Sequence, residues 1–154
     1  MLARLHLVRH GEVHNPDGVV YSDLPGFPLS ILGRHQAEQA ADHLADSGAT
    51  VVATSPLQRA TETAGFIGRR LGIDPQEFSG LTEWGLSLRW AGTVWERLEE
   101  RFPGELAQYF AHPDNLPFSP ESLGEAAART AAVVTALGAT HPGAVAVVVS
   151  HQDP

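Results

Sequence analysis

The sequence predicts an α/β fold built on a largely parallel sheet. Three short apolar runs, residues 3–8, 50–54 and 144–150, have the length and composition of buried strands. Helical patterns over residues 30–48 and 55–72 follow the first two runs. Because parallel strands need long crossovers, this alternation indicates helices on both faces of one sheet, and so a three-layer α/β/α sandwich. The run at 3–8 is apolar on both faces, which is typical of a central strand.

The ends of the two helices carry recognisable signals. Ser30 is the expected N-cap of the first helix, and Gly48 its expected end. In the second helix, Ser55 is the expected N-cap, Pro56 stands at the first helical position, and Gly72 marks the end. The predicted buried stripe of this helix is Ala60, Ala64, Ile67 and Leu71.

The second half of the chain is less regular. An alanine-rich helix is predicted over residues 121–140, with Ser119 or Ser122 as its cap, and a short strand near Phe78. The tryptophans fall in a segment at about 84–118 that is partly helical. Two interpretations of this segment stay open: a lid over a site, or a small satellite core.

Length and composition narrow the possible functions. The 154 residues predict a single domain, 1–154, with the segment 84–118 as an insert. The net charge of −8 argues against a general nucleic-acid binder. The chain has no cysteine and no lysine, which excludes thiol nucleophiles, thiolate metal sites and lysine Schiff bases. No signal-peptide core and no apolar run long enough to span a membrane is present, so a cytoplasmic protein is expected.

Polar residues follow each of the three predicted strands. Arg9 and His10 end the first, Arg59 lies in the helix after the second, and His151 follows the third. The carboxyl ends of parallel strands meet at one edge of a sheet, where ligands of α/β proteins bind. Arginine binds phosphate bidentately, and the amides of a helix N-terminus favour anions. The sequence therefore predicts a cationic pocket for an oxyanion, with phosphate as the expected ligand.

This pocket suggests a chemistry as well as a ligand. A neutral imidazole such as that of His10 is a nucleophile toward phosphorus when an acceptor holds its other nitrogen. Gly11 allows the chain to turn and approach closely just after it. The leaving alkoxide needs a proton, for which Glu83 and Glu12 are the candidate acids.

Two other uses of the histidines are disfavoured. His6 and His10 lie four residues apart on a predicted strand, about 13 Å, so they cannot share a metal ion. Ser150, His151 and Asp153 are too close in sequence to form a hydrolase triad easily, and no G-x-S-x-G motif is present. No metal site is predicted.

Four motifs occur in a recognisable order: LVRHGE at 7–12, SPLQRATETA at 55–64, LTEWG at 81–85 and SH at 150–151. Together they resemble the histidine phosphatase superfamily, branch 1, which includes cofactor-dependent phosphoglycerate mutase. The resemblance implies the phosphoglycerate mutase-like fold, no metal or cofactor, and a small phosphorylated substrate or phosphate as partner.

By position, the resemblance implies a phosphorylated nucleophile at His10 and an acid, then base, at Glu83. The residues implied to bind the phosphoryl group are Arg9, Arg59, His151, Asn15, Gly11 and Gln152. Glu12 remains a competitor for the acid, and Asn15 has the alternative role of capping a turn.

The expected function is hydrolysis of a small phosphomonoester through a phosphohistidine. A phosphoglycerate-type mutase and a non-catalytic phosphate- or partner-binding module are the alternatives, and a homodimer stays open. The likeness runs from Leu5 to Pro154, whereas the family continues with a further helix and strand. A naturally short protein, a fragment and a partly represented protein are the alternatives that stay open, and a sheet that lacks the further strand would have an exposed edge.

Overall fold

The structure is a computed structural model and describes residues 1–152, so Asp153 of the disfavoured triad and Pro154 lie outside it. Its centre is a four-stranded sheet in the order β1-β4-β2-β3, in which every pairing is parallel. The strands are β1 (Arg4–Arg9), β2 (Val51–Thr54), β3 (Gln76–Glu77) and β4 (Val145–Ser150). The predicted α/β class with a mostly parallel sheet is confirmed.

One strand position differs from the prediction. Among the described residues β1 lies at the edge of the sheet rather than at its centre, and β4 and β2 are the inner strands. The side chain of Leu7 on β1 is accordingly 65% exposed. The apolar residues at 3–8 thus predicted a strand correctly, but they did not determine how many strands would pair with it.

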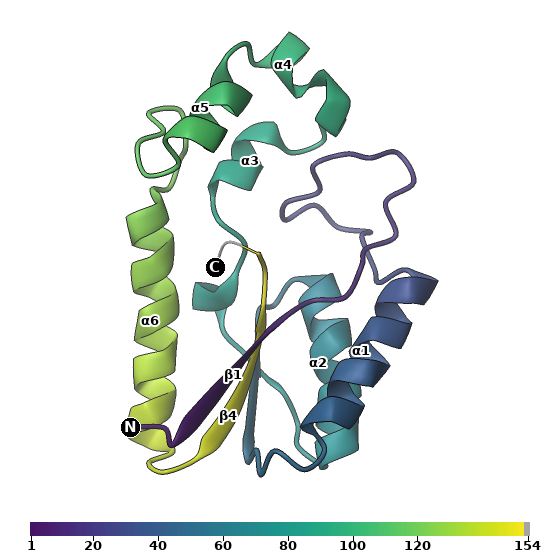
Figure 1. The fold of residues 1–154 in the computed structure, drawn as a ribbon, viewed down its shortest axis with the longest axis vertical. Helices are drawn as coiled ribbons and strands as arrows, with labels where there is room; N and C mark the ends of the chain where they lie inside the picture. The colour runs from purple at the N-terminus through teal and green to yellow at the C-terminus, as the bar shows by residue number, and fades with distance from the viewer. Residues whose placement is uncertain (153–154) are drawn as a thin grey trace.

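Helices cover both faces of the sheet. The long ones are α1 (Ile31–Leu44), α2 (Gln58–Leu71) and α6 (Leu123–Thr140). Figure 1 shows α1 and α2 on one side of the sheet and α6 on the other, which is the predicted three-layer arrangement. Because β4 side chains alternate between faces, Val147 and Val149 pack toward α1 and α2, whereas Ala146 and Val148 pack toward α6.

The helix ends are partly as expected. Ser30 caps α1, its Oγ accepting the Gly33 amide at 2.9 Å, but the helix ends at Leu44, before Gly48. The left-handed C-cap of α2 is Gly72, as predicted, with φ of 71°.

The beginnings of α2 and α6 settle two further expectations. The helix α2 begins at Gln58 after Leu57, without a side-chain cap, so the prediction of Ser55 as N-cap was wrong. Of the two candidates for α6, Ser122 is the cap, in a reciprocal capping box with Glu125.

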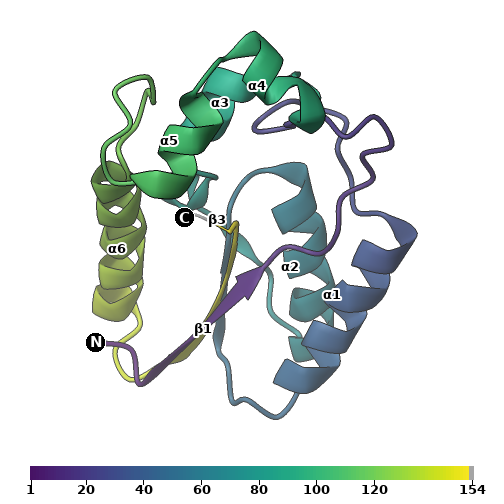
Figure 2. The same cartoon turned by 45° about the horizontal axis from the view of Figure 1, so that its top comes forward.

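Short helices of the insert lie beyond the carboxyl ends of the strands (Figures 1 and 2). They are α3 (Leu86–Trp90), α4 (Leu98–Arg101) and α5 (Glu105–Ala111), with a single 3₁₀ turn at Trp95–Arg97; another 3₁₀ turn, Ser79–Leu81, precedes the insert. Trp84 and Trp90 are each 3% exposed and form a separate hydrophobic cluster there, whereas Trp95 is 44% exposed. The insert therefore has a core of its own; its action as a lid remains a prediction.

Candidate active site

The carboxyl edge of the sheet brings together three residues that are far apart in the sequence. His10 follows β1, Arg59 lies in the first turn of α2, and His151 follows β4; all three are buried. The Arg59 Nε donates a hydrogen bond to His10 Nε2 at 3.2 Å, and the two imidazole centroids are 5.2 Å apart. The parallel topology thus gathers the residues that the sequence placed at three strand ends.

Two hydrogen bonds fix the tautomer of His10. Its Nδ1 lies 2.7 Å from the carbonyl oxygen of Gly11, which can only accept, so Nδ1 carries the proton. Its Nε2 accepts a hydrogen bond from Arg59 and therefore carries the lone pair. The lone pair of His10 therefore faces the cationic side chain, where a phosphoryl group would be bound.

Burial keeps both histidines neutral at pH 7. Desolvation, reinforced by the positive charges of Arg59 and Arg9, lowers the pKa of His10 to about 4, although the Gly11 carbonyl opposes this shift. Desolvation and then Arg59 lower the pKa of His151 to about 2. A bound phosphate dianion would favour protonation of both rings, because it would add negative charge beside them.

Arg59 has unused capacity for hydrogen bonding. Its guanidinium carbon lies 4.7 Å from the centroid of the Tyr21 ring, which supports one face of the group. Its Nη2 is buried and, among residues 1–152, has no hydrogen-bond partner. Buried charged donors are normally satisfied, so this atom indicates a missing acceptor such as a phosphoryl oxygen.

His151 is held from one side and lies near a carboxylate on the other. Its Nε2 lies 2.8 Å from Ser55 Oγ. Its Nδ1 is buried, makes no hydrogen bond to any of the described residues, and lies 3.9 Å from Glu83 Oε2. Of the two candidate acids, Glu83 therefore has its carboxylate beside His151, whereas Glu12 lines the cavity at His10.

The competing acid has a different environment. Glu12 accepts a hydrogen bond from the Ser30 hydroxyl at 2.7 Å, and its backbone amide donates to Gln36. Glu12 thereby ties the loop after His10 to the start of α1, which favours a structural role for its carboxylate.

The loop that carries Glu83 is held by an ion pair from α6 and the segment before it. Arg129 donates to the carbonyl oxygens of Gly80, Thr82 and Glu83 at 3.0, 2.7 and 2.9 Å. It also pairs with the Glu121 carboxylate at 2.6 Å. The hydrogen bond from Arg129 is the main cause that lowers the pKa of Glu121. One guanidinium group thus fixes three backbone carbonyl groups of the short segment that ends at the acid.

Close packing explains the glycine after His10. A Cβ on Gly11 would collide with the backbone carbonyl of Gly33 at the start of α1. The Gly11 amide donates to Thr63 Oγ1 at 3.1 Å, so α2 holds this turn as well. Gly11 was predicted for a sharp turn and a close approach; the structure shows the approach, to α1.

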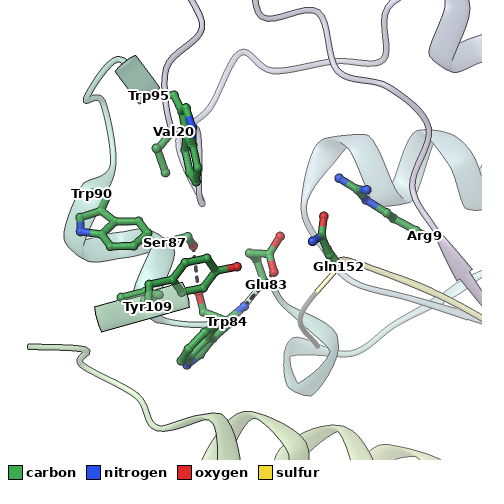
Figure 3. A pocket seen from close by; sticks show the side chains of 10 residues that line it. Arg9, Val20, Glu83, Trp84, Ser87, Trp90, Trp95, Tyr109 and Gln152 are labelled. Carbon is green, nitrogen blue, oxygen red and sulfur yellow. Dashed lines mark hydrogen bonds between the residues drawn. The ribbon is translucent and has the colours of Figure 1, made fainter. Parts of the chain in front are cut away.

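The other predicted phosphate ligands are placed less directly. Arg9 lines cavities both beside His10 and beside Glu83, and Gln152 shares the second of these (Figure 3). The Asn15 side chain exchanges two hydrogen bonds with the backbone of Val19, which is the turn-closing alternative. Contact of these three side chains with phosphate stays a prediction.

Sequence reasoning missed the residues that support the site. Ser55 was interpreted as a helix cap although it contacts His151, and nothing local in the sequence marks Tyr21 or Thr63 as partners of Arg59 and Gly11. The signal for Arg129 was that it is the one basic residue in an alanine-rich helix.

Two negative findings concern the described residues 1–152. No group of three histidine, aspartate or glutamate side chains there is arranged to hold a metal ion. No helix in that range is long and apolar enough to cross a membrane.

Several relatives of this chain are named as phosphatases. Glucosyl-3-phosphoglycerate phosphatase of Mycobacterium tuberculosis is 30% identical over 139 residues, 90% of this chain and 62% of that protein. Phosphoserine phosphatase 1 of Hydrogenobacter thermophilus is 29% identical over 99% of this chain and 72% of its own length. The uncharacterized protein Rv0525 of M. tuberculosis is 57% identical over 67 residues, 44% of this chain and 33% of that one. The chain thus spans between about a third and about two thirds of the length of these M. tuberculosis relatives.

Comparison with solved structures also finds similarity to a phosphatase. The mycobacterial glucosyl-3-phosphoglycerate phosphatase Rv2419c superposes with a TM-score of 0.84 at 29% identity, covering 96% of this chain and 73% of the other. Structures of that protein include complexes with VO3 and with inorganic phosphate. The family model of the histidine phosphatase superfamily, branch 1, matches residues 5–154. The chain therefore belongs to the histidine phosphatase superfamily, branch 1.

Proposed function

We propose that this protein hydrolyses small phosphomonoesters through a phosphohistidine formed on His10. The observation that carries the proposal is that Arg59 Nη2 and His151 Nδ1, buried nitrogens on the two side chains that contact His10, have no hydrogen-bond partner among residues 1–152. The relatives with named activities support a phosphatase.

The first step transfers the phosphoryl group to the protein. His10 Nε2 attacks phosphorus, the N–P bond forms, and the bond from phosphorus to the ester oxygen breaks. Glu83, in its protonated form, gives its proton to the departing oxygen, and the alcohol leaves. Arg9 and Arg59 stabilise the charge on the equatorial oxygens, where a phosphoryl oxygen takes over the hydrogen bond that Arg59 makes to His10.

The second step returns the site to its starting state. A water molecule attacks phosphorus opposite His10 and gives a proton to the Glu83 carboxylate. The N–P bond breaks, and inorganic phosphate and neutral His10 are released. His151, whose Nδ1 lies near Glu83, would hold a phosphoryl oxygen in both steps.

Hydrolysis of p-nitrophenyl phosphate in the presence of EDTA tests this function. We expect the parent protein to be active and His10→Ala to be inactive. Arg70→Lys serves as control, because Arg70 lies in an exposed ion pair with Asp42. Unchanged hydrolysis by His10→Ala would refute the mechanism, and an inactive but folded parent protein would refute the function in favour of a binding module.

A further inference from the structure

The cavity at Glu83 continues away from the histidines into the insert. One part, of about 180 Å³, is lined by Arg9, Glu83, Gln152 and a group of aromatic residues: Trp84, Trp90, Trp95 and Tyr109. A second part, of about 400 Å³, is lined by Tyr21, Arg59, Glu83, Trp95 and Glu96 among others. Both parts open from the proposed acid, so they lie where the leaving group of a phosphate ester must sit.

In the part of the cavity drawn in Figure 3, the aromatic side chains and Arg9 lie on different sides of Glu83. Figure 3 shows Trp90, Trp95 and Tyr109 on one side of Glu83, with Arg9 and Gln152 on the other. The Tyr109 hydroxyl points toward the Glu83 carboxylate in the same view. A group that leaves phosphorus toward Glu83 therefore meets the aromatic side.

Trp95 is exposed and yet held in place. It is 44% exposed, and its ring packs edge-on against buried Trp90, with centroids 6.3 Å apart and an interplanar angle of 85°. Its backbone amide donates to the Gly18 carbonyl at 2.9 Å, and the preceding residue, Val94, bridges to Val19. An anchored indole with a free face is a preorganised surface for stacking on a flat ring.

The charges of the cavity disfavour a second anion on the substrate. Within residues 1–152, the arginines that line it are Arg9 and Arg59, which flank His10 and are engaged by the phosphoryl group in the proposed reaction. The carboxylates that line it are Glu83 and Glu96. A leaving group with its own carboxylate would face these acids without a cation to pair with.

We propose that the leaving-group side of this pocket, formed by Trp95, Glu83 and Glu96, selects phosphomonoesters whose alcohol carries a flat, uncharged ring. The proposal rests on the proposed function and names its substrate class. It distinguishes this chain from the relatives whose names specify the carboxylate-bearing substrates phosphoserine and glucosyl-3-phosphoglycerate.

Matched substrates test the charge component. We expect kcat/KM for 4-carbamoylphenyl phosphate to exceed that for 4-carboxyphenyl phosphate about tenfold, because the two differ mainly in charge. Glu96→Gln should raise kcat/KM for the carboxylate substrate several-fold and so narrow the ratio between the two substrates. Glu38→Gln, which removes an exposed carboxylate on α1, is the control and should change neither.

Matched variants test the stacking component. Trp95→Ala should lower kcat/KM for phenyl phosphate about tenfold, mainly through KM, and should lower kcat/KM for methyl phosphate by a much smaller factor. Trp95→Phe should retain most of the ring preference. Leu88→Ala is the control, because Leu88 is 48% exposed in the same insert but does not line the cavity.

The outcomes of these experiments distinguish a failure of the proposed substrate class from a failure of the proposed phosphatase function. Equal activity on the amide and carboxylate substrates, or equal loss on phenyl and methyl phosphate in Trp95→Ala, would overturn the substrate class while leaving a His10-dependent phosphatase in place. An inactive parent protein, or activity that persists in His10→Ala, would overturn the proposed function and this inference together.

Discussion

Replacing Arg129 by lysine should damage catalysis although the residue lies outside the pocket. The guanidinium group holds three carbonyl oxygens of the loop around Glu83 and pairs with Glu121. Lysine keeps the charge but not the planar fork, so it can satisfy only part of this set. The expected consequence is a displaced acid, not a displaced nucleophile.

The magnitude follows from the burial of the pair. The side chains of Arg129 and Glu121 are 22% and 21% exposed. Breaking a fully buried ion pair costs about 3–5 kcal/mol, so for this partly exposed pair we expect Arg129→Ala to lose about 3 kcal/mol. Arg129→Lys should lose about 1–2 kcal/mol because some hydrogen bonds re-form.

The catalytic effect should depend on the leaving group. A misplacement of about 1 Å costs up to about 100-fold in rate, and a general acid matters most for a poor leaving group. We therefore expect Arg129→Lys to lower kcat/KM, which reports the transfer of the phosphoryl group to His10, 10- to 100-fold for phenyl phosphate and much less for 2,4-dinitrophenyl phosphate. Initial rates at substrate concentrations well below KM measure this, with urea unfolding to verify the fold and Arg70→Lys as control. Equal loss on both esters would refute a role in placing Glu83.

Three further outcomes are expected. Burial lowers the pKa of His10 to about 4, so below pH 6.5 the unfolded chain binds more protons than the folded protein, and the free energy of unfolding should fall as the pH drops from 6.5 toward 4. Between pH 7 and pH 5 this fall should be about 2 kcal/mol smaller in His10→Gln than in the parent protein, as measured by urea unfolding. A variant with the same pH slope as the parent protein would contradict this. Gly11→Ala should lower the free energy of unfolding by at least about 2 kcal/mol and remove most of the activity, because the added Cβ would collide with the Gly33 carbonyl. A variant whose midpoint of thermal unfolding equals that of the parent protein would argue against this close contact. Ser55→Ala should lower kcat about tenfold for p-nitrophenyl phosphate by freeing His151, and an unchanged kcat would show that the hydroxyl does not position the ring.

The parts of the fold that depend on local pattern were predictable. Alternating apolar runs and helical stripes identified the inner strands and the three long helices, and Ser30 and Gly72 marked helix ends through local backbone chemistry. The edge position of β1 was not predictable, because burial of a strand depends on which segments pair with it and not on its own composition.

The residues of the candidate site also fall into a predictable and an unpredictable group. His10, Arg59 and His151 were predictable because parallel topology brings strand ends to one edge and because the motifs are specific. Their supports were not, since Ser55 and Arg129 act through contacts 96 and 46–49 residues away in the chain. Such pairings exist only after the sheet and α6 have packed.

The most direct test of the account is to look for the phosphorylated residue itself. The parent protein and His10→Ala are mixed with p-nitrophenyl phosphate, quenched within milliseconds at alkaline pH, where phosphohistidine survives, and mapped by peptide mass spectrometry. The phosphohistidine mechanism predicts a phosphoryl group on the peptide containing His10 of the parent protein, and its absence in the variant. Turnover with no phosphohistidine in rapid-quench samples, or a phosphoryl group on another residue, would contradict it.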